Sequence, residues 1–404
     1  MSTIDSDILA IEPQLIETRR HFHAHPEASL KEFETAKYIR EKLDAWGIPY
    51  TAVGETGTLG VLQGGKPGPT VLLRGDIDAL DLQELNDVPY RSQYDGLCHA
   101  CGHDAHASAL LYAAYILRQR QDQLPGTVKL AFQQAEEVGA GARLFVSEGH
   151  LNDVDLAFGQ HVTPALDAGT VQIQAGPINA SVDFFKIHVH GKGAHAAAPN
   201  QGRDAALASA AILVHLQNIA SRRVSPNEPI ILSIGKLVAG TRFNVVAEEG
   251  LLEGTLRTLN TKRRDEYVAF IEDQSRAIAE AYGCTVTFEN VNAANVLEND
   301  PQAAAYIRHV AEPLFAPGHI LTNLPASMGG EDFADISQAT KAAFAYIGTK
   351  KDAATGVINH NGHFNIDESQ LKVMVQLHVN VAMHADTFGD FAAAQAPASV
   401  SFDF

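Results

Sequence analysis

Four side chains that can bind metal ions are interleaved in the segment HACGHDAH, at His99, Cys101, His103 and His106. In an extended segment Cys101 and His103 point to the same side, because side-chain directions repeat every two residues. A thiolate beside an imidazole suits a borderline-soft ion such as zinc. The segment is therefore predicted to form part of a metal site.

The same segment contains a C-x-x-C pair, Cys98 and Cys101, which is also found in redox dithiols and in halves of structural zinc knuckles. A knuckle needs a second pair, and Cys284 is the only other cysteine in the chain. A redox pair would leave the interleaved histidines unexplained. A metal site formed by the interleaved cysteine and histidines is favoured over both alternatives.

Two adjacent glutamates, Glu136 and Glu137, end the apolar run VKLAF and its polar extension QQA. Adjacent side chains on an extended backbone face opposite ways, so one can bind metal while the other faces substrate. A carboxylate beside a metal-activated water is a suitable general base. An isolated acidic pair is more often part of an exposed loop. Here, however, five polar side chains directly follow apolar runs, namely Asp76, Asp78, Glu136, Glu137 and His161. If those runs are parallel strands, all five meet at one edge of a sheet.

Further polar residues are weaker candidates. The segment NHNGHF offers His360 or His363 as an additional ligand, and spacing does not choose between them. Asp76 and Asp78, in LLRGDID, are candidates for orienting ligand histidines. His195, in the glycine-flanked loop GKGAHAAAP, is a candidate for facing substrate.

Two other polar groups are interpreted from their setting. Arg242 and Asn244, in TRFNVV, are candidates for binding a carboxylate. The three histidines that precede Pro26, at His21, His23 and His25, are interpreted as surface or capping residues.

The elements that must position these residues alternate between strands and helices. Residues 13–46 are predicted to be helical up to Gly47, and the strands TLGVLQG, TVLLRGDID, VKLAFQQAEE and VDLAFGQH follow with helices ASALLYAAYILRQRQ and GARLFVSEG between them. This order predicts an α/β domain with a mostly parallel sheet covered by helices on both faces. Such sheets bind ligands beyond the carboxyl ends of their strands.

A second domain is predicted from about residue 180. The order β-α-β-β-α-β, from SVDFFKIHVHGKG to CTVTFENV, indicates a four-stranded ferredoxin-like sheet with two helices on one face. We therefore expect a catalytic metal-binding domain over 1–179 and 293–404, and an inserted domain over 180–292. FAYIG as a strand and a helix in SQLKVMVQLHVNVAMHADTF would complete the first domain, and the Ala-rich tail AAAQAPAS is expected to fray.

Bulk composition limits the partners. A formal net charge of −18 over 404 residues argues against binding nucleic acid or anionic membranes, since the phosphates would be repelled. Three cysteines are too few for a disulfide framework and favour a reducing compartment. The N-terminus lacks the basic and apolar segments of a signal peptide, so a cytoplasmic location is expected.

The ordered motifs RRHFHAHPEAS, LLRGDIDAL, HACGHDAH, FQQAEE, GQHV, GKGAHAAAP, TRFNVV with GTLRT, MGGEDF and NHNGHFNIDE resemble one family over nearly the whole length. The chain resembles the aminoacylase and indole-acetyl-amino-acid hydrolase branch of the two-metal carboxypeptidase superfamily. That branch also contains hippurate hydrolases and thermostable archaeal carboxypeptidases. The resemblance implies a catalytic domain with two divalent metal ions and a smaller lid domain that dimerises.

The resemblance also implies a role for individual residues. The implied metal ligands are Cys101, His103, Glu137, His161 and His360, with the thiolate shared between the metals. Glu136 is the implied general base. His195 would steady the oxyanion in a neighbouring subunit's active site, and Asn244 would bind near the substrate carboxylate. We predict that Asp78 is a catalytic residue together with Glu136 and His195.

Four positions depart from the branch. Asp81 and Gln134 stand where a proline is usual, Gly362 replaces the proline after the last histidine, and Cys98 replaces methionine. None of these removes a ligand, so hydrolysis is still expected. They leave the preferred substrate open, and Cys98 adds an oxidation-prone thiol.

The activity that the resemblance implies is hydrolysis of N-acyl or aroyl amino acids to a carboxylic acid and an amino acid, through a metal-bridged hydroxide. Zinc is the expected metal, with manganese, cobalt or nickel as alternatives. A dipeptidase or carboxypeptidase of the same fold, and a non-catalytic metal-dependent binding protein, are the competing interpretations. The expected partners are a small N-acyl amino acid or short peptide and a second copy of the chain.

Overall fold

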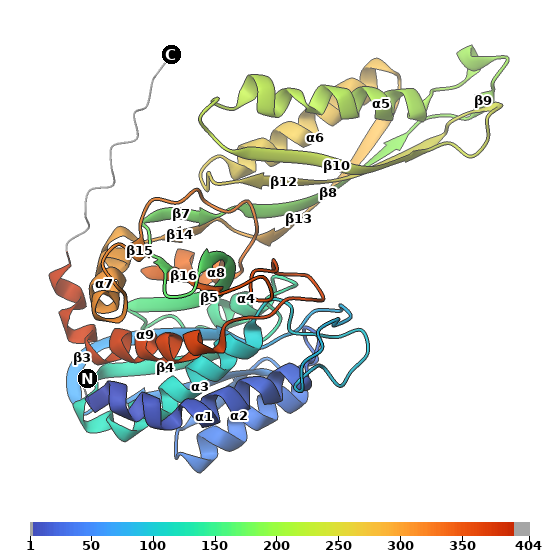
Figure 1. Cartoon of the computed structure of the whole chain (residues 1–404). Coiled ribbons are helices and arrows are strands. Elements are labelled where there is room, and N and C mark those ends of the chain that lie inside the picture. Colours follow the sequence, from blue (N-terminus) through green and yellow to red (C-terminus); the bar gives the residue numbers. More distant parts are fainter. Residues whose placement is uncertain (1–2, 392–404) are drawn as a thin grey trace. The chain divides into compact units, whose positions relative to one another are not determined.

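The computed structural model describes residues 3–391, which form two compact units (Figure 1). Among the described residues, unit 1 comprises 3–176, 298–325 and 332–391, and unit 2 comprises 177–297 and 326–331. The Ala-rich tail lies outside the described residues. Within the part described, no helix combines the length and apolar character that crossing a membrane requires.

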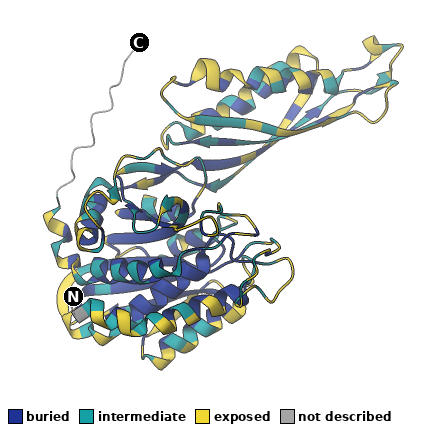
Figure 2. Cartoon of the chain, in the orientation of Figure 1, coloured by how far each residue is buried: buried dark blue, intermediate teal, exposed yellow. Residues whose placement is uncertain are grey.

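Unit 1 is an α/β domain built on a mostly parallel sheet of eight strands in the order β1-β2-β4-β3-β5-β16-β6-β15. Its strands are β1 (Tyr50–Val53), β2 (Gly57–Gln63), β3 (Lys66–Asp76), β4 (Pro125–Gln133), β5 (Leu156–Asp167), β6 (Val171–Gln172), β15 (Ile320–Leu321) and β16 (Ala342–Lys350). The central strands β4, β3, β5 and β16 run parallel to one another and are buried over most of their length (Figure 2). Strands β1 and β2 join antiparallel at one edge. The predicted fold class is confirmed.

The helices of unit 1 cover both faces of this sheet. They are α1 (Thr3–Ala24), α2 (Phe33–Ala45), α3 (His103–Gln119), α4 (Gly141–Ser147), α7 (Pro301–Ala311), α8 (Phe333–Ala339) and α9 (Leu371–Met383). Phe158 on β5 contacts His378 of α9, with ring centroids 5.5 Å apart. The next residue, Gly159, lies against Phe333 of α8. Because neighbouring residues of a strand face opposite ways, α8 and α9 lie on opposite faces.

The first helical segment departs from the prediction. A single helix was expected over residues 13–46, but the chain forms α1 and α2 with an irregular loop between Ala24 and Phe33. Pro26 disfavours helical geometry at the residue before it. Leu30 adopts a left-handed backbone conformation with φ of 64°. The helical spacing that supported the prediction lies in FETAKYIREKLDAW, within α2 and at its end, so it carried no information about the loop before Phe33.

Unit 2 contains a four-stranded antiparallel sheet in the order β10-β12-β8-β13. Its elements are β8 (Ser181–His190), β9 (Ala194–His195), α5 (Ala205–Leu216), β10 (Ile230–Ala239), β11 (Val245–Val246), β12 (Glu249–Thr258), α6 (Arg264–Ala281) and β13 (Thr285–Ala294). The core between sheet and helices contains Phe185 and Ile187 of β8, Ile212 of α5 and Ile271 of α6. The chain passes between the units within β7 (Gly176–Asn179) and β14 (Leu297–Asn299).

One glycine controls how the Cys101–His103 segment enters α3. Gly102 has φ of 92°, and a Cβ built there would lie 2.3 Å from Val162 Cγ2 on β5. Glycine alone avoids both the backbone strain and the overlap. The helix that begins at His103 is therefore held close to the sheet by the absence of a side chain at position 102.

Replacing Gly102 with alanine is expected to destabilise the protein more than replacing Gly96. Gly96 also has a positive φ, 79°, but a Cβ there meets nothing within 4 Å. Gly96→Ala therefore adds only backbone strain, on the order of 1–2 kcal/mol. Gly102→Ala adds steric overlap, typically a further 1–3 kcal/mol. Urea unfolding of both variants measures the difference, and equal midpoints would contradict the packing argument.

Candidate metal centre

The predicted site residues of unit 1 gather where β3 and β4 end, beside the middle of β5. Asp76 is the last residue of β3, and Glu136 and Glu137 lie in the turn that follows β4. His161 lies within β5, which pairs with β3 in parallel. Parallel neighbours bring these ends to one edge of the sheet. This edge is where the sequence predicted that the polar groups would meet.

The side chains of the five predicted ligands form two overlapping groups. Cys101, His103 and His161 place one ligand atom each within 4.8 Å of one another, and so do Cys101, Glu137 and His360. Cys101 Sγ lies 3.3 Å from His161 Nε2, and Glu137 Oε2 lies 3.4 Å from His360 Nε2. Because Cys101 belongs to both groups, the arrangement has the form of two neighbouring cation sites that share a thiolate.

The chemistry of these donors fits divalent metal ions. His103 Nε2 and Glu137 Oε1 are buried and have no hydrogen-bond partner among the described residues. Buried polar atoms are normally satisfied, so an imidazole nitrogen and a carboxylate oxygen that lie 3.8 Å apart without hydrogen-bond partners suit a shared cation. Burial raises the pKa of Cys101, and a bound cation would favour its thiolate form. Thiolate, imidazole and carboxylate together suit zinc and its first-row neighbours.

Asp78 contacts two of the predicted ligands at once. Its Oδ1 lies 3.1 Å from His103 Nδ1, and its Oδ2 accepts hydrogen bonds from Ser29 Oγ at 2.7 Å and the Glu137 amide at 3.1 Å. Burial opposes ionisation of Asp78, but the hydrogen bonds from His103 and Ser29 lower its pKa below the usual value. With Nδ1 of His103 engaged, Nε2 is the atom that faces the centre. Asp78 is thus hydrogen-bonded to two of the predicted ligand residues, an arrangement typical of a side chain that orients metal ligands.

His106 of the HACGHDAH segment has a supporting place. Its Nδ1 lies 2.6 Å from Asp76 Oδ1, and its Nε2 accepts a hydrogen bond from the Val162 amide at 3.0 Å. Both ring nitrogens are thus engaged, with the proton on Nδ1. Arg74 donates to the other oxygen of Asp76 at 2.6 Å. This buried network fixes β3, α3 and β5 beside the ligands.

The prediction that His23 is a surface or capping residue is wrong. His23 is buried, and its ring lies 2.7 Å from Asp104 Oδ2 and 3.1 Å from Glu84 Oε1. Arg19, one helical turn earlier, forms a second ion pair with Asp104 at 2.7 Å. Asp104 directly follows the predicted ligand His103, so α1 anchors the start of α3. The spacing of Arg19 and His23 on one helix face was the signal that could have indicated this.

Glu136 lies beside the ligands, partly exposed. Its Oε2 is 4.0 Å from His103 Nε2, and its Oε1 accepts from the Asp332 amide at 3.4 Å. The Asp332 carboxylate accepts from Arg74 Nη2 and from the Ala142 amide, each at 3.0 Å. Asp332 belongs to the MGGEDF motif, whose contribution the sequence did not specify. It ties the segment before α8 to the turn that carries Glu136.

His360 and His363 differ in position. His360 takes part in the ligand group with Glu137, whereas no group of closely spaced ligand atoms in residues 3–391 includes His363. The backbone of His360 is left-handed, with φ of 61°, and its amide donates to Ala100 O at 2.8 Å. This bond joins the NHNGHF segment to the HACGHDAH segment. The structure therefore brings the first histidine of the pair to the centre.

Two predicted residues belong to unit 2. His195 lies on β9 opposite Val245 of β11, and the Ala196 amide donates to Asn244 O at 3.1 Å. The Ala197 amide donates to His195 Nδ1 at 3.0 Å. When Nδ1 of a neutral imidazole accepts a hydrogen bond, the ring proton is on Nε2. The His195 side chain is exposed, so its Nε2–H is available as a hydrogen-bond donor. Within this unit, His195 and Asn244 thus lie on adjacent segments.

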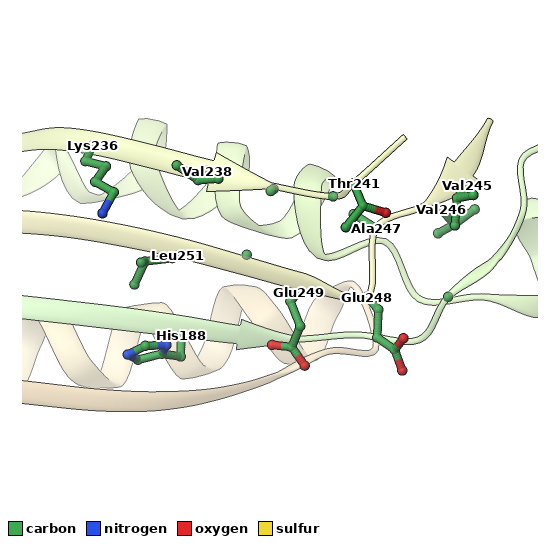
Figure 3. A pocket seen from close by; sticks show the side chains of 14 residues that line it. His188, Lys236, Val238, Thr241, Val245, Val246, Ala247, Glu248, Glu249 and Leu251 are labelled. Carbon is green, nitrogen blue, oxygen red and sulfur yellow. The ribbon is translucent and has the colours of Figure 1, made fainter. Parts of the chain in front are cut away.

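Unit 2 also contains a pocket of ≈ 470 Å³ over β8, β10 and β12 (Figure 3). Its lining combines apolar side chains such as Leu251 with charged ones such as Lys236 and Glu249. None of the five predicted metal ligands lines this pocket, and neither His195 nor Asn244 does. The pocket is therefore distinct from the candidate metal centre.

An α/β domain with clustered Cys, His and Glu ligands at its strand ends, interrupted by an α+β unit, defines a two-domain metal-dependent hydrolase. The sequence model of peptidase family M20/M25/M40 matches residues 72–384, and the chain belongs to this family. It is a metal-dependent enzyme that hydrolyses amide bonds.

Individual relatives cover nearly the whole chain. N-acetyl-L-cysteine deacetylase of Bacillus subtilis is 37% identical over 366 residues, which are 90% of this chain and 86% of the relative. Thermostable carboxypeptidase 2 of Saccharolobus solfataricus is 34% identical over 388 residues, covering 94% and 97% of the two chains. The crystal structure of the YXEP protein of Bacillus subtilis, a dinuclear metal-binding peptidase of the M20 family, has a TM-score of 0.82 and 34% identity, covering 94% and 99%.

Replacing Asp78 with alanine is expected to weaken metal binding by about 10–100-fold, the usual effect of removing a partner of a ligand histidine. The variant removes the carboxylate that His103 Nδ1 and the Glu137 amide share, and leaves His103 Nδ1 only the main-chain carbonyl of Asp78, 2.9 Å away, as an acceptor. Asp78→Asn keeps one acceptor oxygen and should lose less. Zn²⁺ competition titrations against a chelator measure both affinities, and an unchanged affinity in Asp78→Ala would refute the positioning role.

Proposed function

We propose that the enzyme cleaves the amide bond of N-acyl or aroyl amino acids and releases a carboxylic acid and a free amino acid. The observation that carries this proposal is the sharing of Cys101 between two ligand groups with Glu136 beside them. The deacetylase relative acts, by its name, on an N-acetyl amino acid. We propose Cys101, His103, Glu137, His161 and His360 as the ligands of two divalent ions, with zinc as the preferred metal and manganese, cobalt or nickel as alternatives.

Bound metal ions would polarise the amide carbonyl and lower the pKa of a nearby water. We assign Glu136 to take the proton from that water and transfer it to the leaving amine nitrogen. Its carboxylate is tethered by the Asp332 amide on one oxygen, while the other oxygen faces His103. Addition of the deprotonated water to the amide carbonyl carbon gives a tetrahedral oxyanion. Proton transfer from Glu136 to the amine nitrogen then lets the C–N bond break.

Unit 2 would supply contacts to the reacting groups. His195 is proposed to donate Nε2–H to the oxyanion, which the hydrogen bond from the Ala197 amide to Nδ1 favours. Asn244 is proposed to bind near the substrate carboxylate. Its side-chain amide nitrogen is the group that can donate a hydrogen bond to that carboxylate. Arg242 is a further candidate for the same carboxylate.

We also propose that the protein is a homodimer formed through unit 2, with His195 of one subunit serving the centre of the other. Strand β10 lies at the edge of its sheet, where backbone groups are available to a second strand. Its Leu237 and Val238 are exposed. On α5, Leu207 and Val214 are also exposed, with Val214 at 70%. An apolar helix surface and an apolar edge strand on one unit support association there.

Two further assignments complete the proposal. Three free cysteines, Cys98, Cys101 and Cys284, support a cytoplasmic, reducing location. Hydrolysis of peptides is the second candidate function, and the carboxypeptidase relative favours it. A non-catalytic binding protein is disfavoured, because Glu136 and all five predicted ligands are present.

Glu136→Gln is expected to abolish turnover, with a loss of at least about 10²–10⁴-fold, while metal content stays unchanged. Glutamine keeps the size of the side chain and its acceptor for the Asp332 amide, but it cannot take up the proton. Metal analysis and amino-acid release from N-acetyl and N-benzoyl amino acids, alongside dipeptides, test this. Near-normal activity in the variant, or full activity in metal-free enzyme, would refute the mechanism; faster release from dipeptides would select the peptidase alternative.

Co-expression of two inactive variants is expected to restore activity if His195 acts across subunits. His195→Ala and Glu136→Gln subunits, carrying different tags and purified through both, would form a mixed dimer. One centre in that dimer has an intact Glu136 and receives an intact His195. A mixed dimer of Glu136→Gln and Asp78→Ala should stay impaired, since both substitutions lie in unit 1. Equal activity in the two mixed dimers would exclude action across subunits.

A further inference from the structure

The loop that separates α1 from α2 reaches the turn that carries Glu136. Glu32, the last residue of this loop, is fully buried. Its Oε1 accepts hydrogen bonds from the amides of Leu30 and Ala135, both at 2.9 Å. Its Oε2 accepts from Thr56 Oγ1 at 2.7 Å. The buried carboxyl group of Glu32 thus accepts three hydrogen bonds, two from backbone amides and one from a hydroxyl.

The two amides belong to strained residues. Three non-glycine residues in the described chain have positive φ, namely Leu30 at 64°, Ala135 at 55° and His360 at 61°. A left-handed backbone costs a residue with a Cβ roughly 1–2 kcal/mol. Such strain persists only where surrounding contacts enforce it. One oxygen of Glu32 thus holds two of the three left-handed residues.

Ala135 immediately precedes the proposed base and the proposed ligand. Its left-handed conformation turns the chain away from β4, and its carbonyl accepts from the Ala140 amide at 3.1 Å to close the turn. On the far side of Glu136, the amide of Glu137 is held by Asp78. Two buried carboxylates therefore fix the amides at positions 135 and 137, with Glu136 between them.

We infer that Glu32 is a positioning residue for this reaction, which holds Ala135 left-handed so that Glu136 and Glu137 face the metal centre. The inference rests on the proposed roles of these two glutamates. Glu32 would act through the backbone and would contact neither metal nor substrate. Its removal should let Ala135 relax to a common conformation and rotate both glutamates away.

Four substitutions test this inference. Glu32→Ala is expected to reduce kcat by about 10–100-fold and to weaken Zn²⁺ binding in a chelator competition. Glu32→Gln should retain most of both, because its amide oxygen can accept from the two backbone donors and its nitrogen can donate to Thr56. Adding Ala135→Gly to Glu32→Ala should recover much of kcat and Zn²⁺ affinity, since glycine adopts positive φ without strain.

Leu30→Gly in the Glu32→Ala background is the matched control. It relieves the same kind of strain at the other residue that Glu32 holds, so it should raise the melting temperature without restoring kcat or Zn²⁺ affinity. A purely structural role for Glu32 predicts that both glycine substitutions rescue equally or that neither does. Either result, or an unimpaired Glu32→Ala variant, would overturn the inference.

Failure of the proposed function gives a different result. If Glu136 were not the base, Glu136→Gln would keep its activity, while the Zn²⁺ titrations of the Glu32 variants would still report on the placement of Glu137. If Glu32→Ala does not fold, the Glu32→Gln variant decides. Loss of Zn²⁺ affinity in folded Glu32→Gln that Ala135→Gly does not restore would overturn the positioning role.

Discussion

The candidate metal centre depends on a buried carboxylate that serves two ligands. Asp78 accepts from His103 and from the backbone of Glu137, so the imidazole and the glutamate turn are fixed relative to one another. Without a shared acceptor, each would sample several conformations, and a cation would have to order them on binding. Ser29 holds the second oxygen of Asp78 from the loop after α1. These hydrogen bonds hold His103 and Glu137 in place without a metal ion. Affinity for a metal ion is then favoured, because the two side chains lose less conformational freedom when it binds.

The parallel sheet determines where this preparation takes place. Strands β3 and β4 end side by side next to the middle of β5, and the polar groups there come together although they lie far apart in sequence. Two further segments complete the site, the HACGHDAH segment at the start of α3 and the NHNGHF segment. The hydrogen bond from the His360 amide to Ala100 O joins them. Gly102 lets the first of these approach β5, since any Cβ would overlap Val162. The close packing of Gly102 against Val162 therefore also places the neighbouring residues Cys101 and His103 at the site.

Buried ion pairs adjoin the predicted ligands. Arg19 and His23 of α1 pair with Asp104, and Arg74 of β3 pairs with Asp76 and Asp332. Buried charges are costly unless they are paired and hydrogen-bonded. Their presence at this edge of the sheet, beside a set of ligand atoms, fits a role in orientation more than in stability. The first helix, which contributes no predicted ligand, thereby becomes part of the support for the centre.

Local sequence patterns determined much of this protein. Hydrophobic runs indicated the strands and the inserted unit, and the interleaved HACGHDAH segment indicated metal chemistry, because side-chain period and ligand chemistry are local properties. Only the tertiary structure decided which polar residues meet. Spacing left His360 and His363 equivalent. It also assigned His23 to the surface, since the two carboxylates that contact His23, those of Glu84 and Asp104, lie more than 50 residues away in sequence. The loop at Glu32 was hidden inside an apparently continuous helix. Its partner Ala135 lies 103 residues away, and no local pattern reports a contact made through space.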